Sequence, residues 1–344
     1  MIEIREMSPF DGPGFAEWHG ALAAGALDGR VAASISSLRE LTDSLASPSP
    51  VKRRIAVAAF RGERCVGAML FEMMLQSDLD SAMVEINVPP GHRQNGVGSA
   101  LWEWAERRAG QERRSIFQTE ISVPTGHTIE TWPGARFATA LGFVSANVED
   151  HLLVDLPFDP ERLASLEART SARDGYRVEA WSGRCSDRYV RAWADLHTAM
   201  SADVPTGELT REAVVHTVER VRTDEERLAK NWIALNSLAL TEDGEAAGYS
   251  TLFLPRTQPE HAYQDDTLVL RGHRGHNLGS MLKVANLREF ARLPPVDRSS
   301  RRWLHTYTEQ GNAPMQAVNA RFGYRRVEVM HEFEKRADVT PSNK

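Results

Sequence analysis

Residues 91–98 read GHRQNGVG, and residues 272–279 read GHRGHNLG. The arginines of these two segments, Arg93 and Arg274, lie 181 positions apart (274 − 93). The same offset links Leu141-Gly142-Phe143 to Phe322-Gly323-Tyr324 (323 − 142) and Val66-Gly67 to Ala247-Gly248 (248 − 67). Three landmarks with one offset indicate an internal duplication whose period is the size of a whole domain.

The length agrees with a duplication, because 344 residues at roughly 150 per domain give about two domains. The stretch between the two copies contains two prolines and a short polar helical pattern, which is typical of a linker. We therefore predict one domain over residues 1–157, a linker over residues 158–175 and a second domain over residues 176–344.

The composition excludes several classes of protein. Hydrophobic residues make up 42% of the chain and charged residues 26%, which is typical of a globular protein and not of disorder or a coiled coil. The net charge of -6 disfavours nucleic acid as a partner. Neither a signal peptide nor an apolar stretch long enough for a membrane is recognisable, so we expect a cytoplasmic protein without a membrane partner. The oligomeric state is not readable from the sequence.

The hydrophobic pattern places each glycine-containing segment between a strand and a helix. In the first half the strand is predicted at Ala82–Val88 and the helix at Val97–Arg108, and in the second half they are predicted at Asp266–Leu270 and Ser280–Ala291. Strands and helices mix in each half in the same order, which predicts an α/β fold in which helices cover a mixed sheet. A further helix is predicted at Arg211–Lys230.

A glycine loop that runs directly into a helix is suited to hold a phosphate group. The free backbone N–H groups and the positive end of the helix dipole attract an anion. Gly96 can adopt a positive φ angle, and Gly98 puts no side chain in the way of a ligand. One such loop is more often an ordinary turn, but two in the same register are a strong signal. A P-loop and a dinucleotide fingerprint both fit less well, because their residue patterns are missing.

The pattern Arg-x-x-Gly-x-Gly after a strand, followed by a further strand and a helix that ends in Leu-Gly-Phe, resembles the GNAT superfamily of acetyl-coenzyme A-dependent N-acetyltransferases. The tandem layout is similar to double-GNAT proteins of the mycothiol synthase type, and the motifs are also similar to aminoglycoside-type acetyltransferases. The resemblance implies two tandem GNAT domains, each a mixed, mostly antiparallel sheet covered by helices, and acetyl-coenzyme A as the cofactor.

The resemblance also implies which residues hold the cofactor. The loop amides would bind its pyrophosphate, and its pantetheine arm would pair with the end of the strand before the loop. The implied residues are Val88, Arg93, Gln94, Asn95, Gly96, Val97, Gly98 and Ser99 in the first half, and Val269, Arg274, Gly275, His276, Asn277, Leu278, Gly279, Ser280 and Asn312 in the second. Asn277 replaces a loop glycine, which favours the first half as the catalytic one, whereas Asn312 keeps the family's Asn-led helix, which favours the second half.

An amine acceptor must lose a proton before it attacks a thioester, which at pH 7 costs about 4–5 kcal/mol. Glu85 and Asp266, again 181 apart, lie on the strands that face the acyl group and are the candidate bases, and Glu120 is a third candidate. Each of these residues could equally be a salt-bridged strand residue. Weaker candidates are His127, His305 and Glu309. The resemblance also implies a tyrosine that protonates the departing thiolate of coenzyme A. The two corresponding positions are occupied here by Ala138 and Asn319.

The acceptor itself is less well indicated. Asp203 and Glu208 lie in a long loop of the second half and would suit an ammonium group, but Thr210 in the same stretch could simply cap a helix. A metal site is not expected, because two cysteines and scattered histidines do not form a ligand set.

The prediction is an acyltransferase that moves an acetyl group from acetyl-coenzyme A to a primary amine of a small molecule by direct attack. Antibiotic and specialised-metabolite amines are acceptors that the resemblance suggests. Two alternatives stay open. One or both halves could bind acetyl-coenzyme A without catalysis, or the acceptor could be a protein lysine.

Overall fold

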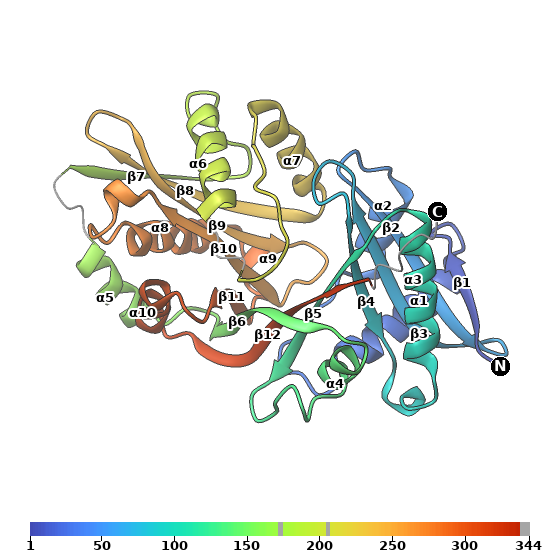
Figure 1. Cartoon of the computed structure of the whole chain (residues 1–344). Coiled ribbons are helices and arrows are strands. Elements are labelled where there is room, and N and C mark those ends of the chain that lie inside the picture. The colour runs from blue at the N-terminus through green and yellow to red at the C-terminus, as the bar shows by residue number, and fades with distance from the viewer. Residues whose placement is uncertain (171–174, 204–206, 338–344) are drawn as a thin grey trace. The chain divides into compact units, whose positions relative to one another are not determined.

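A computed structural model describes residues 1–170, 175–203 and 207–337 (Figure 1). The first half contains β1 (Glu3–Met7), α1 (Gly12–Ala26), α2 (Leu38–Ala46), β2 (Lys52–Arg61), β3 (Arg64–Met74), β4 (Ser81–Asn87), the 3-10 turn η1 (Pro90–His92), α3 (Val97–Gln111), β5 (Ile116–Pro124), α4 (Pro133–Ala140) and β6 (Val144–Asp155).

The second half repeats this order after a connecting helix. It contains α5 (Pro160–Thr170), β7 (Tyr176–Ser182), α6 (Val190–Asp203), α7 (Val218–Asn231), β8 (Trp232–Thr241), β9 (Ala246–Pro255), β10 (His261–Val269), η2 (Arg271–His273), α8 (Leu278–Arg292), α9 (Pro295–Arg298), β11 (Trp303–Glu309), α10 (Ala313–Phe322) and β12 (Arg325–Arg336). The strand–loop–helix order predicted around both glycine loops is confirmed.

The chain forms two compact units that do not follow the order of the sequence. Unit 1 is Met1–Val148, Thr206–Glu212 and Glu328–Lys344, and unit 2 is Glu149–Pro205 and Ala213–Val327. Unit 1 thus includes most of β12 from the second half of the chain, and unit 2 includes most of β6 from the first half. The predicted boundaries at 157 and 175 divide the repeat in the sequence and stay a prediction. Residues 171–174 of the predicted linker and 338–344 of the predicted second domain lie outside the described residues.

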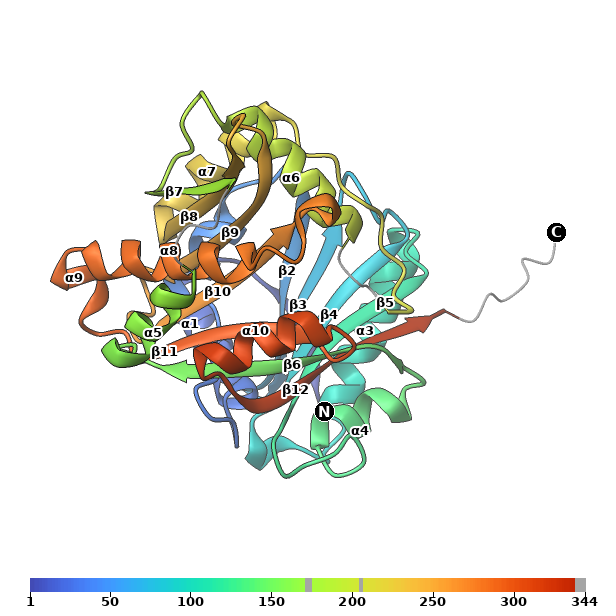
Figure 2. The same cartoon turned by 90° about the vertical axis from the view of Figure 1, so that its left-hand side faces the viewer.

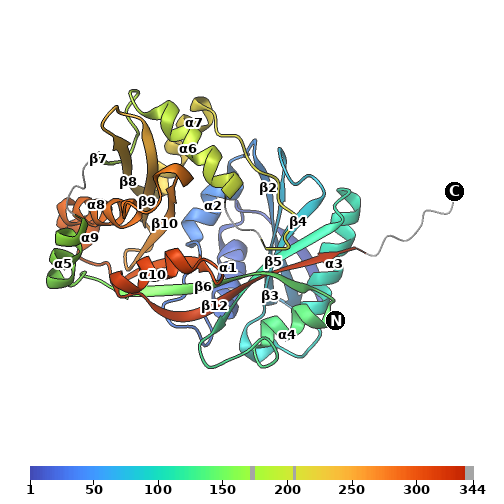
Figure 3. The same ribbon diagram turned by 60° about the vertical axis from the view of Figure 1, so that its left-hand side comes forward.

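The strand pairs show this exchange directly. In unit 1, β12 pairs antiparallel with β5 from Glu328 opposite Pro124 to Arg336 opposite Ile116 (Figure 3). In unit 2, β6 pairs antiparallel with β11 from Glu149 opposite Glu309 to Asp155 opposite Trp303 (Figure 2).

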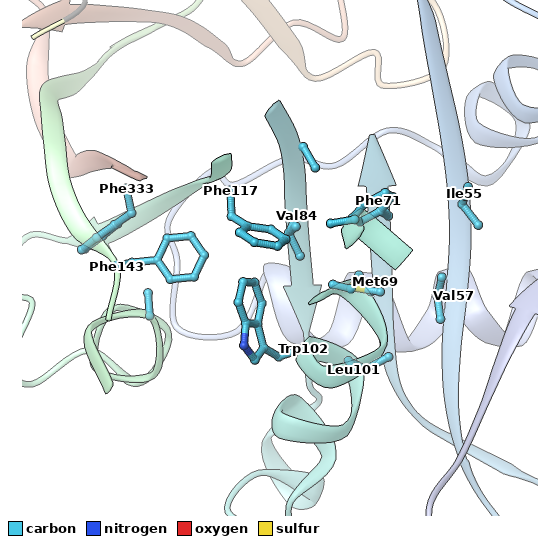
Figure 4. Packing of buried hydrophobic residues seen from close by; sticks show 14 of the residues in the cluster. Ile55, Val57, Met69, Phe71, Val84, Leu101, Trp102, Phe117, Phe143 and Phe333 are labelled. Carbon is cyan, nitrogen blue, oxygen red and sulfur yellow. The ribbon is translucent and has the colours of Figure 1, made fainter. Parts of the chain in front are cut away.

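The strands of unit 1 lie in the order β1-β2-β3-β4-β5-β12, and among these pairs only β4 and β5 run parallel. Successive side chains of a strand point to opposite faces of the sheet, so one strand can carry apolar residues on both faces. Ile55 and Val57 of β2 pack in the cluster that contains α3, whereas Ala56 and Ala58 pack against α1 and α2. Figure 4 shows the first cluster, in which Trp102 lies beside Phe117 and Phe143.

The strands of unit 2 lie in the order β6-β11-β10-β9-β8-β7, and among these pairs only β10 and β11 run parallel. Leu235 packs in the cluster of α8, whereas Leu238 packs in that of α6 and α7, so these helices cover opposite faces (Figure 1). The mixed, mostly antiparallel strands of each unit, covered by helices, confirm the predicted fold class. No described helix is long and apolar enough to cross a membrane.

The prediction of a helix from Arg211 was wrong at its start. Helix α7 begins at Val218, and the Thr217 hydroxyl accepts a hydrogen bond from the Arg220 amide, which makes Thr217 the cap. The Thr210 hydroxyl instead donates to Glu334 Oε1 at 2.9 Å. Residues 206–212 belong to unit 1, and this tertiary contact outweighs the local capping preference.

Candidate active site

In unit 1 the two parallel strands separate at their carboxyl ends. The last pair joins Met83 of β4 to Gln118 of β5, although β4 continues to Asn87 and β5 to Pro124. Beyond this pair the strand edges are free to bond to something other than each other. An extended chain that contains amide groups can pair with such an edge as an added strand.

Unit 2 has the same separation. The last pair of β10 and β11 joins Tyr263 to His305. Between Gln264 and Thr267 the register of β10 against β9 also shifts, which marks a bulge that bends the strand. Both units therefore present a splayed pair of parallel strands at the end where the glycine loop begins.

The glycine loop of unit 1 reaches the amino terminus of α3 through left-handed residues. Gln94 has a φ of 57° and Gly96, the N-cap of α3, has a φ of 78°. Arg93 Nε donates to the carbonyl of Val88 at 3.0 Å, and its Nη1 lies 2.9 Å from Asp28 Oδ2. The arginine thus ties the loop to the strand end, and the first amides of α3 have no partner within the helix.

The loop of unit 2 is built in the same way. Gly275 has a φ of 87°, and Asn277 caps α8 with a φ of 60°. Arg274 Nε donates to the carbonyl of Val269 at 3.0 Å, and its Nη2 lies 2.6 Å from Asp203 Oδ2. The other Asp203 oxygen accepts from Arg271 at 3.2 Å, so Asp203 anchors this loop.

The other predicted cofactor residues lie around these two turns. Asn95 Nδ2 donates to the Arg93 carbonyl at 2.8 Å, and a Cβ added to Gly98 would lie 3.1 Å from Phe137 Cζ. Asn312 caps α10 by accepting from the Met315 amide. Val97 and Leu278 are buried first residues of the helices, and Ser99, His276, Gly279 and Ser280 belong to the same two turns. Open amides beside a splayed strand fit a pyrophosphate and an amide-bearing arm.

Two predicted carboxylates of unit 1 flank the separated strands. Glu85 lies two residues beyond Met83 on β4, and Glu120 lies two residues beyond Gln118 on β5. Burial raises the pKa of Glu85, although Asn87 Nδ2 donates to its Oε1 at 2.9 Å. The Glu120 side chain is accessible to solvent, yet desolvation by the protein around it still raises its pKa.

A third carboxylate, which the sequence did not point to, completes this group. Glu332 of β12 lies directly opposite Glu120 in the strand register, and its charge also raises the pKa of Glu120. Arg211 Nη2 lies 2.9 Å from Glu332 Oε2 and offsets part of this repulsion. Neither residue could have been found from the sequence, because both reach unit 1 only through the exchanged segments.

The carboxylates of unit 2 are held differently. Asp266 accepts a hydrogen bond from the Tyr249 hydroxyl at 3.0 Å, and desolvation by the surrounding protein raises the pKa of Asp266. Desolvation and the charge of Asp266 also raise the pKa of its neighbour Asp265. His197 Nδ1 lies 3.4 Å from the Tyr249 oxygen, and burial lowers the pKa of this histidine to about 4. Asp266 is thus part of a hydrogen-bonded network.

The weaker candidates lie in other surroundings. His305 Nδ1 is 2.8 Å from His151 Nε2, and its Nε2 is 2.9 Å from His261 Nδ1, which makes a row of three buried imidazoles in unit 2. His127 is next to Trp132 in unit 1, with ring centres 5.1 Å apart, and Glu309 pairs with β6 at Glu149.

The two predicted acceptor residues are in different units. Asp203 belongs to unit 2, and the exposed Glu208 belongs to unit 1, where its amide donates to the Ala146 carbonyl at 2.8 Å. In the part of the chain that is described, no group of three His, Cys, Asp or Glu residues could hold a metal ion.

The residues at the two positions where the resemblance implies a tyrosine differ in polarity. Ala138 is a buried apolar residue of unit 1. In unit 2, Asn319 Oδ1 accepts from Lys283 Nζ at 2.7 Å, and Asn319 Nδ2 donates to Thr308 Oγ1 at 2.8 Å. Lys283 was not predicted as a site residue from the sequence, because a lysine in a helix is usually exposed.

Comparison with known proteins agrees with this geometry. Residues 26–127 match the model of the acetyltransferase (GNAT) family. The mycothiol acetyltransferase of Rothia mucilaginosa is 29% identical over 189 residues, which are 53% of this chain and 50% of that relative, so the match spans about half the length of each.

Two solved structures have a similar fold. A tandem GNAT protein from the clavulanic acid biosynthesis pathway superposes with a TM-score of 0.79 at 24% identity and covers 98% of both chains. A GCN5-related N-acetyltransferase from Sphaerobacter thermophilus superposes with a TM-score of 0.64 at 15% identity, over 97% of this chain and 95% of that one.

Residues 26–127 are therefore similar to a GNAT-family acetyltransferase domain. Over its whole length the chain has the fold of a tandem GNAT protein, which confirms the resemblance seen in the sequence.

Proposed function

We propose that this protein transfers an acetyl group from acetyl-coenzyme A to a primary amine of a small molecule, by direct attack in unit 1. The observation that carries the proposal is the position of three carboxylates in unit 1, Glu85, Glu120 and Glu332, beside the separated strands β4 and β5. Carboxylates in opposite positions on neighbouring strands repel each other unless a cation lies between them. A protonated amine is a cation that would relieve this repulsion.

The proposed mechanism uses the chain's own groups for binding and proton transfer. When bound, acetyl-coenzyme A supplies an activated acyl group as a thioester. The amides at the start of α3 hold its pyrophosphate, and the free edge of β4 near Val88 pairs with its arm. Glu85 or Glu120 accepts the proton of the ammonium group, and the neutral amine then attacks the acyl carbon without a covalent enzyme intermediate.

Substitution of the two candidate bases tests this assignment. We expect Glu85→Gln or Glu120→Gln to lower kcat/KM by about a hundredfold or more, with a smaller change in the affinity for acetyl-coenzyme A. Glu106→Gln on α3 is the matched control, because this carboxylate only pairs with Lys335 at 3.2 Å. A double Gln variant that retains activity within about twofold of the native enzyme would exclude both residues as bases.

The order of steps has a separate test. Direct attack predicts intersecting lines in double-reciprocal plots. A ping-pong pattern, or an acetylated enzyme trapped without acceptor, would contradict direct attack.

The two loops can be tested individually by calorimetric titration with acetyl-coenzyme A. Gly96→Val should remove binding to unit 1, because Gly96 has a φ of 78° that a β-branched residue does not adopt. Gly279→Val should weaken binding to unit 2 by placing a side chain beside the first turn of α8. If neither substitution changes the titration, the assignment of both loops is wrong.

A second candidate function applies to unit 2, which would bind the cofactor without turning it over. It is favoured by the hydrogen bond that engages Asp266 with Tyr249 and by Asn277 in place of a loop glycine. In this case Asp266→Asn would leave turnover unchanged in a chain whose Glu85→Gln variant is inactive.

The nature of the acceptor is part of the proposal. The clavulanic acid pathway relative favours amines of specialised metabolites, including antibiotics. The alternative acceptor is a protein lysine. A screen that follows thiol release with small amines and with lysine-containing peptides distinguishes the two, because only the true acceptor class should give saturable turnover.

A further inference from the structure

Unit 2 contains a buried lysine that the proposed transfer does not use. Lys283 of α8 is 2% exposed, and burial lowers its pKa to about 7. Among the described residues its Nζ donates to Asn319 Oδ1 at 2.7 Å, and it lies 5.7 Å from the centre of the Tyr324 ring. An ammonium group can donate three hydrogen bonds, so this amine retains capacity to bind a further group.

The lysine is connected to the separated strands of unit 2. Asn319 also bonds Thr308, which lies on β11 three residues beyond the last pair with β10 at His305. The helix that carries Lys283 begins at the glycine loop. Lys283 is therefore joined, through one side chain, to β11, the strand that separates from the β10 edge along which the arm of coenzyme A is proposed to lie.

Other polar atoms on α8 also have no partner among the described residues. Ser280 Oγ and both side-chain polar atoms of Asn286 are buried and make no hydrogen bond. These residues precede and follow Lys283 by three positions, which places all three on one side of the helix. Buried polar groups normally have partners, so this side of α8 has unused hydrogen-bonding capacity.

The corresponding place in unit 1 is apolar. The offset of 181 relates Lys283, Asn319 and Tyr324 to Trp102, Ala138 and Phe143 (283 − 102, 319 − 138 and 324 − 143). The centres of the Trp102 and Phe143 rings lie 5.2 Å apart (Figure 4). At the equivalent positions in unit 2, Lys283 Nζ lies 5.7 Å from the centre of the Tyr324 ring. In unit 1 these three positions hold apolar side chains, and the amine of Lys335, which is only partly buried, lies 4.8 Å from the centre of the Trp102 ring. A lysine buried at position 283 itself therefore needs a reason beyond packing.

We propose that Lys283 recognises the sulfur atom of coenzyme A in unit 2, so that this unit binds free coenzyme A in preference to acetyl-coenzyme A. The inference rests on the proposed binding of the cofactor to the loop of unit 2. It makes unit 2 a sensor of the product of the transfer that unit 1 carries out.

The chemistry is a proton transfer between the two groups. The lone pair of the neutral Lys283 amine takes the proton of the coenzyme A thiol, so that one S–H bond breaks and one N–H bond forms. The resulting ammonium and thiolate attract each other in surroundings of low polarity, and a neighbouring cation favours the thiolate. The sulfur of acetyl-coenzyme A carries no proton and no charge, so it gains nothing from this amine.

The experiment uses the full chain with Gly96→Val, which leaves unit 2 as the binding site. Coenzyme A, desulfo-coenzyme A and acetyl-coenzyme A are titrated calorimetrically near pH 7.5. We expect coenzyme A to bind about ten- to a hundredfold more tightly than the other two, as for a hydrogen bond to a charged group. Lys283→Met should remove this preference, whereas Lys335→Met, a lysine of unit 1 near the Trp102 ring, should retain it.

Equal affinities for the three ligands, a preference that survives Lys283→Met, or no binding at all would each overturn the inference. Failure of the proposed function would appear elsewhere, as turnover that survives the double substitution Glu85→Gln and Glu120→Gln. If Lys283→Met does not fold, the ultraviolet absorbance of the thiolate serves instead. Coenzyme A bound to the Gly96→Val chain should ionise at lower pH than free coenzyme A, and an unchanged or raised midpoint would overturn the inference.

Discussion

At the scale of the residue, the two units differ in the ionisable groups that they place near their separated strands. Unit 1 gathers Glu85, Glu120 and Glu332 at its separated strands, whereas unit 2 adds the amine of Lys283 to its own carboxylates. Both arrangements cost desolvation energy that only a partner charge or a ligand offsets. These groups are therefore where substitutions should separate function from stability.

The first residue-scale prediction concerns pH. A general base works only when it is deprotonated, and burial raises the pKa of Glu85 above its usual value near 4.5. We expect kcat/KM to fall as the pH decreases through this raised pKa. A pH–rate profile measures the midpoint, and in Glu85→Gln this limb should disappear. A native profile that stays flat down to pH 4.5 would contradict the assignment.

The second residue-scale prediction concerns stability. The pKa of Lys283 falls from 10.5 in the unfolded chain to about 7 in the folded one, so folding disfavours the charged form. The penalty is absent above pH 10.5, grows as the pH falls, and is complete below about 7. At 1.36 kcal/mol per pKa unit, this penalty is at most about 5 kcal/mol. A substitution that removes the amine gains this amount of stability, less the contribution of the lost hydrogen bond to Asn319.

Chemical denaturation should show the stability that is gained when the amine of Lys283 is removed. We expect Lys283→Met to increase the free energy of unfolding by about 1–3 kcal/mol at pH 7 and by much less at pH 10. A loss of stability at pH 7 would mean that the amine is a structural group after all.

At the scale of the element, the glycine loops show how one backbone conformation is reached by two sequences. Gly96 and Asn277 both cap a helix in the left-handed region, with φ angles of 78° and 60°. Asparagine tolerates this region better than other residues with a Cβ, so the duplicated turn survives the replacement.

Substitution of the cap measures the cost of that conformation. Gly96→Ala should destabilise unit 1 by about 1 kcal/mol and weaken its binding of acetyl-coenzyme A, because a residue with a Cβ resists the left-handed region. Asn277→Gly should leave stability unchanged or slightly raised, since glycine adopts the same φ freely. Denaturation and calorimetry measure both effects, and an Ala variant as stable as the native chain would contradict the account.

At the scale of the whole molecule, the exchange of strands makes each unit depend on both halves of the chain. The edge of β5 is covered by β12, whose Phe333 is 1% exposed in the core of unit 1. A fragment of residues 1–157 contains a complete sequence repeat but lacks this strand. We expect the fragment to unfold without a cooperative transition, because it loses the pairing partner of β5 and a large buried side chain.

The control for this fragment is a peptide of residues 325–337 added in trans. It should restore a cooperative transition, and a peptide with Phe333→Ala should do so less well. Cooperative unfolding of the fragment alone would show that the exchanged strand is dispensable.

The sequence by itself determined the duplication, the fold class and the place of both glycine loops. These features depend on local patterns, namely the shared offset of 181, the alternation of strands and the left-handed caps, and such patterns can be read one segment at a time. Glu85 and Glu120 could be nominated for the same reason, because they lie on the strands that flank the first loop.

Only the tertiary structure decided which groups meet. Glu332 and Arg211 reach Glu120 because β12 and residues 206–212 belong to unit 1, and the start of α7 moved from Arg211 to Val218 for the same reason. Lys283 is buried because Asn319 of α10 lies beside its amine, whereas a lysine in a helical sequence pattern is predicted to be exposed. Contacts between segments far apart in the chain leave no local signal, since their energy arises only when the fold brings them together.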